Sequence, residues 1–555
     1  MAVLSGAEIL IQALIQENVE VIFGYPGGAV LPIYDVLYDC PLNHYLCRHE
    51  QGAIHGADGY ARSTGKVGVC LATSGPGSTN LVTGLATAYM DSVPIVAFTG
   101  QVNSKMLGKD AFQEADIKGI TLPITKHNYL VTQIEELAQT VKEAFYIART
   151  GRPGPVLIDL PKDVMTARTE FAYPERLDLP GYNPTYQGHA LQVRAAATEI
   201  DQAERPVIFA GGGSISANAA PELRELAWKA NIPVITSLMG LGVFPENDLL
   251  SLGMPGMHGC RSANYAISEA DLLIAIGVRF DDRVTGRLDS FAAKARIIHI
   301  DIDPAEISKN VEIAIPIVGD AKEILKELLP LVKGKSREKW HKQLAEWKEK
   351  HPLKYENNSE EIKPQQVIEE IYRQTRGEAC IVTEVGQNQM WAAQYYQYSI
   401  PRTYISSGGL GTMGFGLPAS VGVQVGRPGE IVVNISGDGS FQMNLQELAT
   451  LKNYNLPVKI VILNNSSLGM VRQWQEMFYD RRYSATILTN PDFIKLAEAY
   501  GIFARRVEKK EGLALAIEKA LQVAGPALLD VKVAQEENVY PMVPAGAGIK
   551  EMIGG

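Results

Sequence analysis

The stretch from Ile431 to Gly469 constrains the fold of this chain more than any other segment. A β-branched apolar run, Ile431 to Ile435, leads into the tripeptide Gly437-Asp438-Gly439. Leucines at helical spacing follow, and a second apolar run, Val458 to Leu463, ends at Asn464-Asn465. This order predicts a strand, a turn, a helix, a second strand and a second turn, which together make one βαβ unit. A right-handed crossover places both turns at the carboxyl edge of a parallel sheet, where open α/β sheets bind ligands.

The two predicted turns offer oxygen ligands for a metal ion. Asp438 supplies a carboxylate and Asn465 a side-chain carbonyl, and Mg²⁺ prefers such oxygens when it also holds phosphate. The glycines beside Asp438 let backbone approach an anion closely, and the start of the next helix attracts negative charge. Gly, Asp and Asn are also common in ordinary turns. We favour a metal and diphosphate site because both turns close buried strands across one helix.

The length and patterning of the chain predict several domains. A chain of 555 residues is too long for one hydrophobic core, and three domains are expected. Strand and helix patterns alternate over residues 1–165, 190–335 and 364–535, so we predict an α/β protein with three doubly wound parallel-sheet domains. We expect residues 536–555, which are rich in Pro and Gly, to form an irregular tail.

Composition narrows the choice of partners and compartment. The net charge of −10 gives no reason to expect nucleic acid or an anionic membrane as a partner. The five cysteines are odd in number and form no CxxC pair, which argues for a reducing compartment and against a zinc site. No apolar run reaches membrane-spanning length, and Ser5 to Glu8 is typical of a helix capping box, not of a signal peptide. We therefore expect a cytoplasmic protein.

Glu50 is a candidate acid, and its position allows two interpretations. It lies where a strand pattern turns into a helical one. A carboxylate there can simply stabilise the helix N-terminus. Alternatively, burial can raise its pKa so that it shares a proton with a ring nitrogen of a ligand.

Two glycine-rich segments are candidate nucleotide sites. Gly409, Gly411 and Gly414 form a GxGxxG string. Glu430 follows about twenty residues after it, as a dinucleotide site would require, but it precedes its strand and cannot reach a ribose at the carboxyl edge. The triplet from Gly211 to Gly213 follows a predicted strand directly and is the better candidate.

Together these motifs resemble a known enzyme family. RHEQGA, SGPGSTN and GRPGPVLIDLPKDV resemble the pyrimidine-binding domain of thiamine diphosphate (ThDP) decarboxylases and oxidases, and the paired GDG and NN turns resemble their diphosphate-binding motif. PGMHGC and GVRFDDRVTG resemble the central FAD-binding Rossmann-like domain of the catalytic, large subunits of acetohydroxyacid (acetolactate) synthases. The resemblance spans nearly the whole chain in order.

The resemblance implies ThDP, Mg²⁺ and FAD as cofactors. It implies that Glu50 bonds the aminopyrimidine ring, that Met413 supports the bent cofactor, and that the Ser467 carbonyl joins Asp438 and Asn465 on the metal. The other residues implied at ThDP are Gly411, Gln387, Asn388, Gly437, Gly439, Ser440 and Met470. Those implied at FAD are Arg152, Gly211, Gly212, Gly213, His258, Gly259, Arg279, Asp301 and Asp320. Asn388 stands where the family usually has a histidine that contacts the diphosphate, and we expect its amide to donate a hydrogen bond there instead.

The segment LGMVRQWQEMFYDRRYS after Asn465 has the pattern of an aromatic amphipathic helix, which alone needs no functional reason. In the family, Met470, Val471 and Trp474 of this segment would line the substrate pocket. The tryptophan would favour 2-ketobutyrate through contact with its extra methylene, an effect of about 10- to 200-fold. The remaining residues implied in catalysis or substrate binding are Arg283, which would hold the acceptor carboxylate, and Phe112, Gln113 and Lys162, which would come from a partner chain.

The activity implied by the resemblance is decarboxylation of pyruvate and carboligation to a second 2-keto acid. Pyruvate as acceptor gives 2-acetolactate and 2-ketobutyrate gives 2-aceto-2-hydroxybutyrate, the first common step of branched-chain amino acid (Val, Leu, Ile) biosynthesis. The family implies a homodimer or homotetramer with active sites at the subunit interface, and a small regulatory subunit. The alternatives are a pyruvate oxidase, in which FAD accepts electrons, and a flavoprotein without catalytic activity. The sequence leaves the preferred acceptor open.

Overall fold

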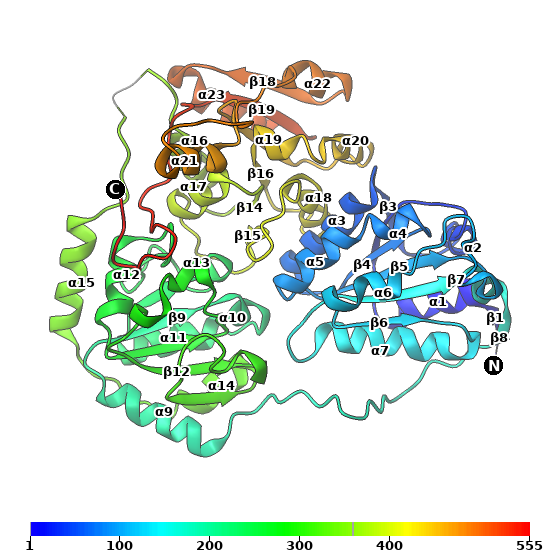
Figure 1. Cartoon of the computed structure of the whole chain (residues 1–555), viewed down its shortest axis with the longest axis horizontal. Coiled ribbons are helices and arrows are strands. Elements are labelled where there is room, and N and C mark those ends of the chain that lie inside the picture. Colours follow the sequence, from blue (N-terminus) through cyan, green and yellow to red (C-terminus); the bar gives the residue numbers. More distant parts are fainter. Residues whose placement is uncertain (1, 358–359, 555) are drawn as a thin grey trace.

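Three parallel sheets, each flanked by helices, organise this computed structural model, which describes residues 2–357 and 360–554 (Figure 1). Every strand pairing within the three sheets is parallel, and a separate two-stranded antiparallel sheet joins β1 (Val3–Ser5) to β8 (Arg168–Glu170). The predicted α/β class with three parallel-sheet domains is confirmed. The parts of the chain around these three sheets are called the first, second and third units.

The first unit has six strands in the order β3–β2–β4–β5–β7–β6. Its strands are β2 (Val21–Gly24), β3 (Asn43–Leu46), β4 (Gly68–Ala72), β5 (Ile95–Gln101), β6 (His127–Leu130) and β7 (Val156–Pro161). Its helices are α1 (Gly6–Gln16), α2 (Leu31–Leu37), α3 (Glu50–Thr64), α4 (Pro76–Thr79), α5 (Val82–Met90), α6 (Ile117–Thr121), α7 (Leu137–Arg149) and α8 (Lys162–Thr166). The capping box predicted at Ser5 and Glu8 opens α1, with both of its hydrogen bonds present.

The second unit has five strands in the order β10–β9–β11–β12–β13. They are β9 (Pro206–Ala210), β10 (Val234–Thr236), β11 (Leu272–Ile276), β12 (Arg296–Asp301) and β13 (Ile315–Val318). The helices are α9 (Ala190–Gln202), α10 (Gly212–Ser216), α11 (Ala220–Ala230), α12 (Arg261–Glu269), α13 (Asp282–Thr285), α14 (Ala321–Leu328) and α15 (Glu338–Lys350). Residues 171–189, which contain no helix or strand, run as a long connection from the first unit to α9 (Figure 1).

The third unit has six strands in the order β15–β14–β16–β17–β19–β18. They are β14 (Cys380–Thr383), β15 (Tyr404–Ile405), β16 (Val432–Gly437), β17 (Lys459–Asn464), β18 (Phe503–Val507) and β19 (Ala527–Lys532). The helices are α16 (Pro364–Thr375), α17 (Gln387–Tyr395), α18 (Gly416–Gly426), α19 (Asp438–Phe441), α20 (Leu448–Asn453), α21 (Gly469–Phe478), α22 (Phe493–Ala499) and α23 (Leu513–Gln522).

The predicted βαβ unit lies at the centre of this third sheet. β16 and β17 are parallel neighbours, with Gly437 opposite Leu463. Asp438 and Asn465 follow the carboxyl ends of these two strands, as the sequence predicted. The connection between the strands holds two short helices, α19 and α20, where the sequence predicted one longer helix.

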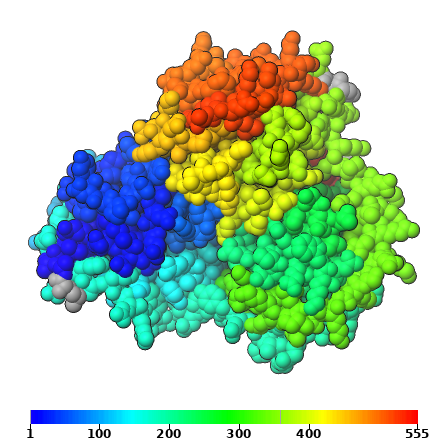
Figure 2. All heavy atoms as spheres, turned by 180° about the vertical axis from the view of Figure 1, so that it is seen from behind, coloured from blue at the N-terminus to red at the C-terminus, as the bar shows by residue number. Residues whose placement is uncertain are grey.

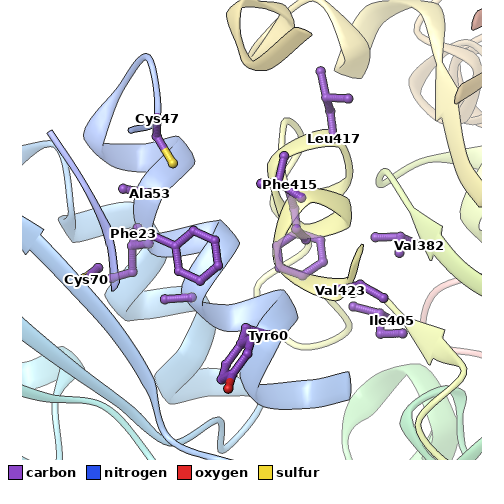
Figure 3. Packing of buried hydrophobic residues seen from close by; sticks show 14 of the residues in the cluster. Phe23, Cys47, Ala53, Tyr60, Cys70, Val382, Ile405, Phe415, Leu417 and Val423 are labelled. Atoms are coloured by element: carbon purple, nitrogen blue, oxygen red, sulfur yellow. The ribbon is translucent and has the colours of Figure 1, made fainter. Parts of the chain in front are cut away.

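The first and third units pack through α3 and α18, which cross with their backbones almost in contact. A Cβ added to Gly422 would lie 1.8 Å from the carbonyl oxygen of Gly56, and one added to Gly59 would lie 2.1 Å from that of Ala419. One buried apolar cluster continues across this crossing, with Phe23 from the first unit and Phe415 from the third (Figure 3). Glycine therefore permits a helix contact that larger residues would prevent.

In the space-filling view all three units are in contact, and the yellow segments of the third unit lie between the first and the second (Figure 2). The C-terminal segment after β19 contains no helix or strand of its own up to Gly554. Within the described part of the chain, no helix combines the length and apolar character needed to cross a bilayer.

Candidate functional site

A cavity at the carboxyl ends of β14, β16 and β17 contains both predicted turns. Its space amounts to about 450 Å³, part of it open to solvent, and Asp438, Asn465 and Ser467 lie on its wall. The other expected ThDP and substrate residues on this wall are Gln387, Asn388, Met413, Gly437, Gly439, Ser440, Met470 and Val471. The fold thus brings together residues that are far apart in the sequence.

Asp438 is the only carboxylate on this wall among the described residues. Its side chain is buried, and burial raises its pKa to about 6. A bound cation would favour the charged form of this carboxylate. A Mg²⁺ held by one carboxylate and one amide needs further oxygen ligands, which a diphosphate and water can supply. The buried hydroxyl of Ser467, which has no hydrogen-bond partner in the described part of the chain, adds a further polar group at this place. These residues fit a metal-bound diphosphate.

Asn388 lies on the same wall, but its amide nitrogen is already engaged. The Nδ2 group donates to the backbone carbonyls of Glu384 (3.1 Å) and Ile435 (3.0 Å). The amide oxygen faces the glycine turn, since a Cβ on Gly437 would lie 3.4 Å from Asn388 Oδ1. A hydrogen bond from Asn388 to a diphosphate, which the sequence led us to expect, would therefore require one of these backbone bonds to break.

Glu384 holds the loop that carries Met413 through hydrogen bonds from backbone N–H groups. The carboxylate accepts hydrogen bonds from the backbone N–H groups of Gly414 (2.8 Å) and Leu417 (3.1 Å). Glu384 is fully buried, and burial raises its pKa to about 7 although the N–H donors act against this rise. Gly411, in the same loop, has φ +68, a conformation that favours glycine. It does not line the cavity itself.

Glu50 does not line this cavity. Among the residues described, no residue of the first unit lies on its wall. Glu50 is 9% exposed, and its Oε2 accepts a hydrogen bond from Asn80 Nδ2 (2.9 Å). A Cβ on Gly77 would lie 3.3 Å from Glu50 Oε1, and one on Gly75 would lie 2.9 Å from the Cβ of Gln113. Glu50 and Gln113 therefore both lie against the glycine-rich loop that contains Gly75 and Gly77.

Two other residues expected from a partner chain lie on the surface of the first unit. Phe112 is 88% exposed, which is unusual for a large apolar side chain. Lys162 is also exposed and begins α8 at the carboxyl end of β7. Both side chains are accessible for contact with a second chain.

A second, larger cavity of about 1120 Å³, also partly open to solvent, lies where the first and second units meet. The expected FAD residues on its wall are Arg152, Gly212, Gly213, Arg279, Asp301 and Asp320. Arg152 forms ion pairs with Asp303 (3.1 Å) and Glu306 (2.7 Å). Arginines for a diphosphate and carboxylates for sugar hydroxyls fit an extended dinucleotide such as FAD.

Gly211 supports the second cavity without lining it. A Cβ on this glycine would lie 2.1 Å from the carbonyl oxygen of Gly277. The turn after β9 therefore needs glycine for close packing against the end of β11. Gly277 and Gly213 are on the wall, so this packing shapes the cavity.

Four further expected site residues also lie on neither cavity wall. His258 is buried, and burial lowers its pKa to about 4, so it is neutral near pH 7. Gly259 packs against Pro255 in the same loop. Arg283 lines a third cavity, of about 460 Å³, together with Val543 and other tail residues. Trp474 is half-buried in α21, with its ring 5.5 Å from that of Phe478.

Sequence reasoning missed two residues that bear on the cavity around Asp438. Glu384 directly follows β14, and an acid at the carboxyl end of a strand is a signal that could have identified it. Asn490 donates a hydrogen bond from Nδ2 to Asp438 Oδ2 (2.6 Å). Asn490 lies in a loop before Pro491, and no pattern in the sequence distinguishes it from an ordinary turn residue.

Protein-family models match the chain in three consecutive blocks. Residues 4–120 match the N-terminal TPP binding domain of thiamine pyrophosphate (ThDP) enzymes. Residues 193–328 match the central domain of these enzymes, and residues 384–531 match their C-terminal TPP binding domain. The blocks contain the three parallel sheets in the same order, apart from a few strands at their borders.

Curated relatives match over nearly their whole length. The acetolactate synthase large subunit of Buchnera aphidicola subsp. Schizaphis graminum is 51% identical over 564 aligned residues, which cover 100% of this chain and 99% of that protein. The acetolactate synthase isozyme 3 large subunit of Escherichia coli (strain K12) is 49% identical, with coverage of 100% and 99%. The acetolactate synthase large subunit of Corynebacterium glutamicum is 51% identical, with coverage of 98% and 89%. The resemblance seen in the motifs is confirmed, and the chain belongs to the thiamine pyrophosphate enzymes and, within them, to the family of acetolactate synthase large subunits.

Proposed function

We propose that this chain uses ThDP, Mg²⁺ and FAD to decarboxylate pyruvate and join the remaining two-carbon unit to a second 2-keto acid. The product is 2-acetolactate with pyruvate as acceptor and 2-aceto-2-hydroxybutyrate with 2-ketobutyrate. The observation that carries the proposal is the cavity that joins Asp438, Asn465 and Met413 in a chain about half identical to acetolactate synthase large subunits. We assign pyrimidine binding to residues 1–165, FAD binding to 190–335 and diphosphate binding to 364–535.

The third unit would hold the diphosphate end of ThDP. Asp438, Asn465 and the backbone carbonyl of Ser467 would bind Mg²⁺, and the glycines beside Asp438 would let the backbone N–H groups approach phosphate oxygens. Met413 lies on the same wall and would support the rings of the cofactor. When bound, ThDP supplies the electron sink that accepts the negative charge left by the loss of CO₂.

Glu50 would act on a cofactor bound to a second copy of the chain. Its carboxylate lies on the first unit, away from the cavity of its own third unit, and it carries one hydrogen bond from Asn80. A buried carboxyl group can bond a ring nitrogen and exchange a proton with it. This separation supports a homodimer or homotetramer in which each active site takes residues from two chains, with Phe112, Gln113 and Lys162 on the same side as Glu50.

The second cavity would hold FAD. Arg152 and Arg279 would bind its diphosphate, and Asp301 or Asp320 would accept hydrogen bonds from its hydroxyl groups. His258 and Gly259 remain proposed FAD contacts through the loop that they share. Since the carboligation produces no net oxidation, we propose a structural role for the flavin.

The acceptor pocket would lie between the ThDP cavity and α21. Val471 is exposed and on the cavity wall, and Trp474 lies one helical turn further on. Arg283, which is exposed beside the tail, would bind the acceptor carboxylate. The tail would then form part of the wall around the substrate.

Two further proposals concern the setting of the enzyme. The relatives are named large subunits, which supports a small regulatory subunit as partner. The five cysteines are all unpaired, which supports a reducing compartment such as the cytoplasm. The products proposed above are precursors of branched-chain amino acids, so we place the enzyme in biosynthesis.

Product analysis tests the proposal directly. The purified chain would be incubated with ThDP, Mg²⁺, FAD and pyruvate, with and without 2-ketobutyrate, and the products identified by mass spectrometry. We expect 2-acetolactate from pyruvate alone and both products from the mixture. Reduction of the flavin by pyruvate without 2-acetolactate would instead favour a pyruvate oxidase, and no release of CO₂ would exclude both enzymes.

A further inference from the structure

We propose that Asn490 is a positioning residue that fixes the orientation of the Asp438 carboxylate for Mg²⁺. The inference rests on the proposed metal site and adds a residue that the ligand set does not include. Asn490 lies in the loop before α22, outside the ThDP cavity wall, so any effect on the metal must pass through the residues that it contacts, Asp438 first among them.

A short hydrogen bond joins the two side chains. Asn490 Nδ2 donates it to Asp438 Oδ2 at 2.6 Å. Gln442 connects the same two residues, because its Nε2 donates to Asn490 Oδ1 (3.0 Å) and to the backbone oxygen of Asp438 (2.9 Å). Asn490 thus holds Oδ2, and Oδ1 receives no side-chain hydrogen bond among the described residues, so Oδ1 can turn toward a metal.

A series of hydrogen bonds that starts at the buried Asp530 determines which way the Asn490 amide faces. Asp530 is fully buried and accepts from Arg506 Nε through Oδ2 (2.9 Å) and from Asn464 Nδ2 through Oδ1 (2.7 Å). Because a carboxylate only accepts, Asn464 must turn its nitrogen toward Asp530 and its oxygen toward Asn490. Asn490 Nδ2 then donates to Asn464 Oδ1 (3.2 Å) as well as to Asp438.

These hydrogen bonds also link the ends of the two strands that carry the proposed metal ligands. Asp438 follows β16, and Asn464 is the last residue of β17, directly before the ligand Asn465. Asn490 therefore bridges the two strand ends, and it sets both the rotation of the carboxylate and its distance from Asn465. Partners of this kind behind a metal ligand typically change metal affinity about 10- to 100-fold when they are removed.

Substitution of Asn490 tests the inference through metal binding itself. Mg²⁺ would be titrated calorimetrically into the metal-free protein at saturating ThDP, for the wild type, Asn490→Ala and Asn490→Leu. The leucine variant keeps a similar volume, so agreement between the two variants would assign the effect to the lost donor. Thr489→Ala is the matched control, because Thr489 is exposed and lies in the same loop.

We expect the dissociation constant for Mg²⁺ to rise about 10- to 100-fold in both Asn490 variants and to stay unchanged in Thr489→Ala. Turnover at saturating Mg²⁺ should recover toward that of the wild type, since the ligands themselves are intact. A purely structural role would instead lower turnover at every Mg²⁺ concentration. Unchanged Mg²⁺ affinity in a folded Asn490 variant would overturn the inference.

The same titration separates this inference from the proposed function. If the wild type binds ThDP without any dependence on Mg²⁺, the proposed metal site itself is wrong. If the wild type requires Mg²⁺ and the Asn490 variants match it, only the positioning role fails. Should Asn490→Ala not fold, Asn490→Leu carries the test, and retained FAD absorbance would show that the second unit is intact.

Discussion

At the residue scale, different hydrogen-bond partners give three buried carboxylates different tasks. Asp438, Glu384 and Glu50 are all buried carboxylates at the ends of strands or the start of a helix. Asp438 is held by an amide and lines a cavity, whereas Glu384 is surrounded by backbone N–H donors. Glu50 has Asn80 as its hydrogen-bond partner and lies on a different unit from the cavity. The partners, more than the residue type, determine what each acid can do.

Trp474 is the residue on which acceptor preference should depend. We expect Trp474→Leu to lower the ratio of 2-aceto-2-hydroxybutyrate to 2-acetolactate about 10-fold or more, because a smaller side chain loses contact with the extra methylene. Product ratios from equimolar pyruvate and 2-ketobutyrate would measure this effect. Phe478→Leu, which changes the ring packed against Trp474, serves as the control for helix packing. An unchanged ratio would remove Trp474 from substrate selection.

The sequence predicted those site residues that lie at the end of a strand. Asp438 and Asn465 could be found because both end apolar runs that form neighbouring strands. The orientation of Asn388 could not be predicted, since it depends on two carbonyl groups that only the folded chain brings near. Asn490 was missed for the same reason, because its contact with Asp438 joins residues 52 positions apart.

At the element scale, apolar patterning identified central strands better than edge strands. The central strands β16 and β17 lie within about two residues of the apolar runs, Ile431 to Ile435 and Val458 to Leu463, that predicted them. β3 and β6, which form the two edges of the first sheet, carry polar residues such as Asn43 and His127 and were not predicted. An edge strand needs less apolar surface, so its sequence shows a weaker signal.

Helix α18 shows how one element connects stability with the site. Its first N–H groups bind Glu384, and the Met413 loop leads directly into it. The pKa of Glu384 is raised to about 7 from an ordinary value of 4.5, so folding favours its protonated form. The stability from this group is present below pH 4.5 and is lost as pH rises through 7.

Glu384→Gln should therefore reduce the dependence of stability on pH. One pKa unit corresponds to about 1.4 kcal/mol, so the loss in the wild type between pH 4.5 and 7 is of the order of 3 kcal/mol. Melting temperatures from pH 5 to 8 would show a steeper decline for the wild type than for the variant. Glu378→Gln, an exposed residue on the same unit, is the control. Parallel pH profiles for wild type and Glu384→Gln would contradict this account.

At the scale of the whole molecule, the crossing of α3 and α18 fixes the first unit against the third. Gly422→Ala should weaken this contact, because the added Cβ would lie 1.8 Å from the Gly56 carbonyl oxygen. Overpacking costs about 1 to 3 kcal/mol, which exceeds the gain of about 1 kcal/mol from replacing glycine in a helix. Denaturant unfolding would measure the loss, and Gly429→Ala is the control because a Cβ added there would meet no described atom within 4 Å. A stabilised Gly422→Ala protein would show that the helices can separate without cost.

The proposed division of the active site between two chains has the largest consequence for the molecule. Glu50 and the Asp438 cavity lie on different units of one chain, and the cavity wall takes no residue from the first unit among those described. Under the proposed function, a second chain would supply Glu50 to each cavity. Glu50→Gln and Asp438→Ala proteins should each be nearly inactive when assembled alone, for lack of the ring-bonding carboxyl group in one and of a metal ligand in the other.

Mixed assemblies of these two inactive variants should recover activity if each site takes Glu50 from the opposite chain. In a mixed dimer, one site combines both substitutions, and the other combines an intact Glu50 with an intact Asp438. Random assembly makes about half of the dimers mixed, so we expect about a quarter of the wild-type rate of 2-acetolactate formation. Co-expression with two different affinity tags would isolate the mixed dimers, which should reach about half of the wild-type rate.

The control is a chain that carries both substitutions, assembled with the wild type. Each site of this mixed dimer carries one substitution, so the dimer should be nearly inactive. If each chain completed its own site, the results would reverse, because the first mixture would stay inactive and the second would retain one intact site.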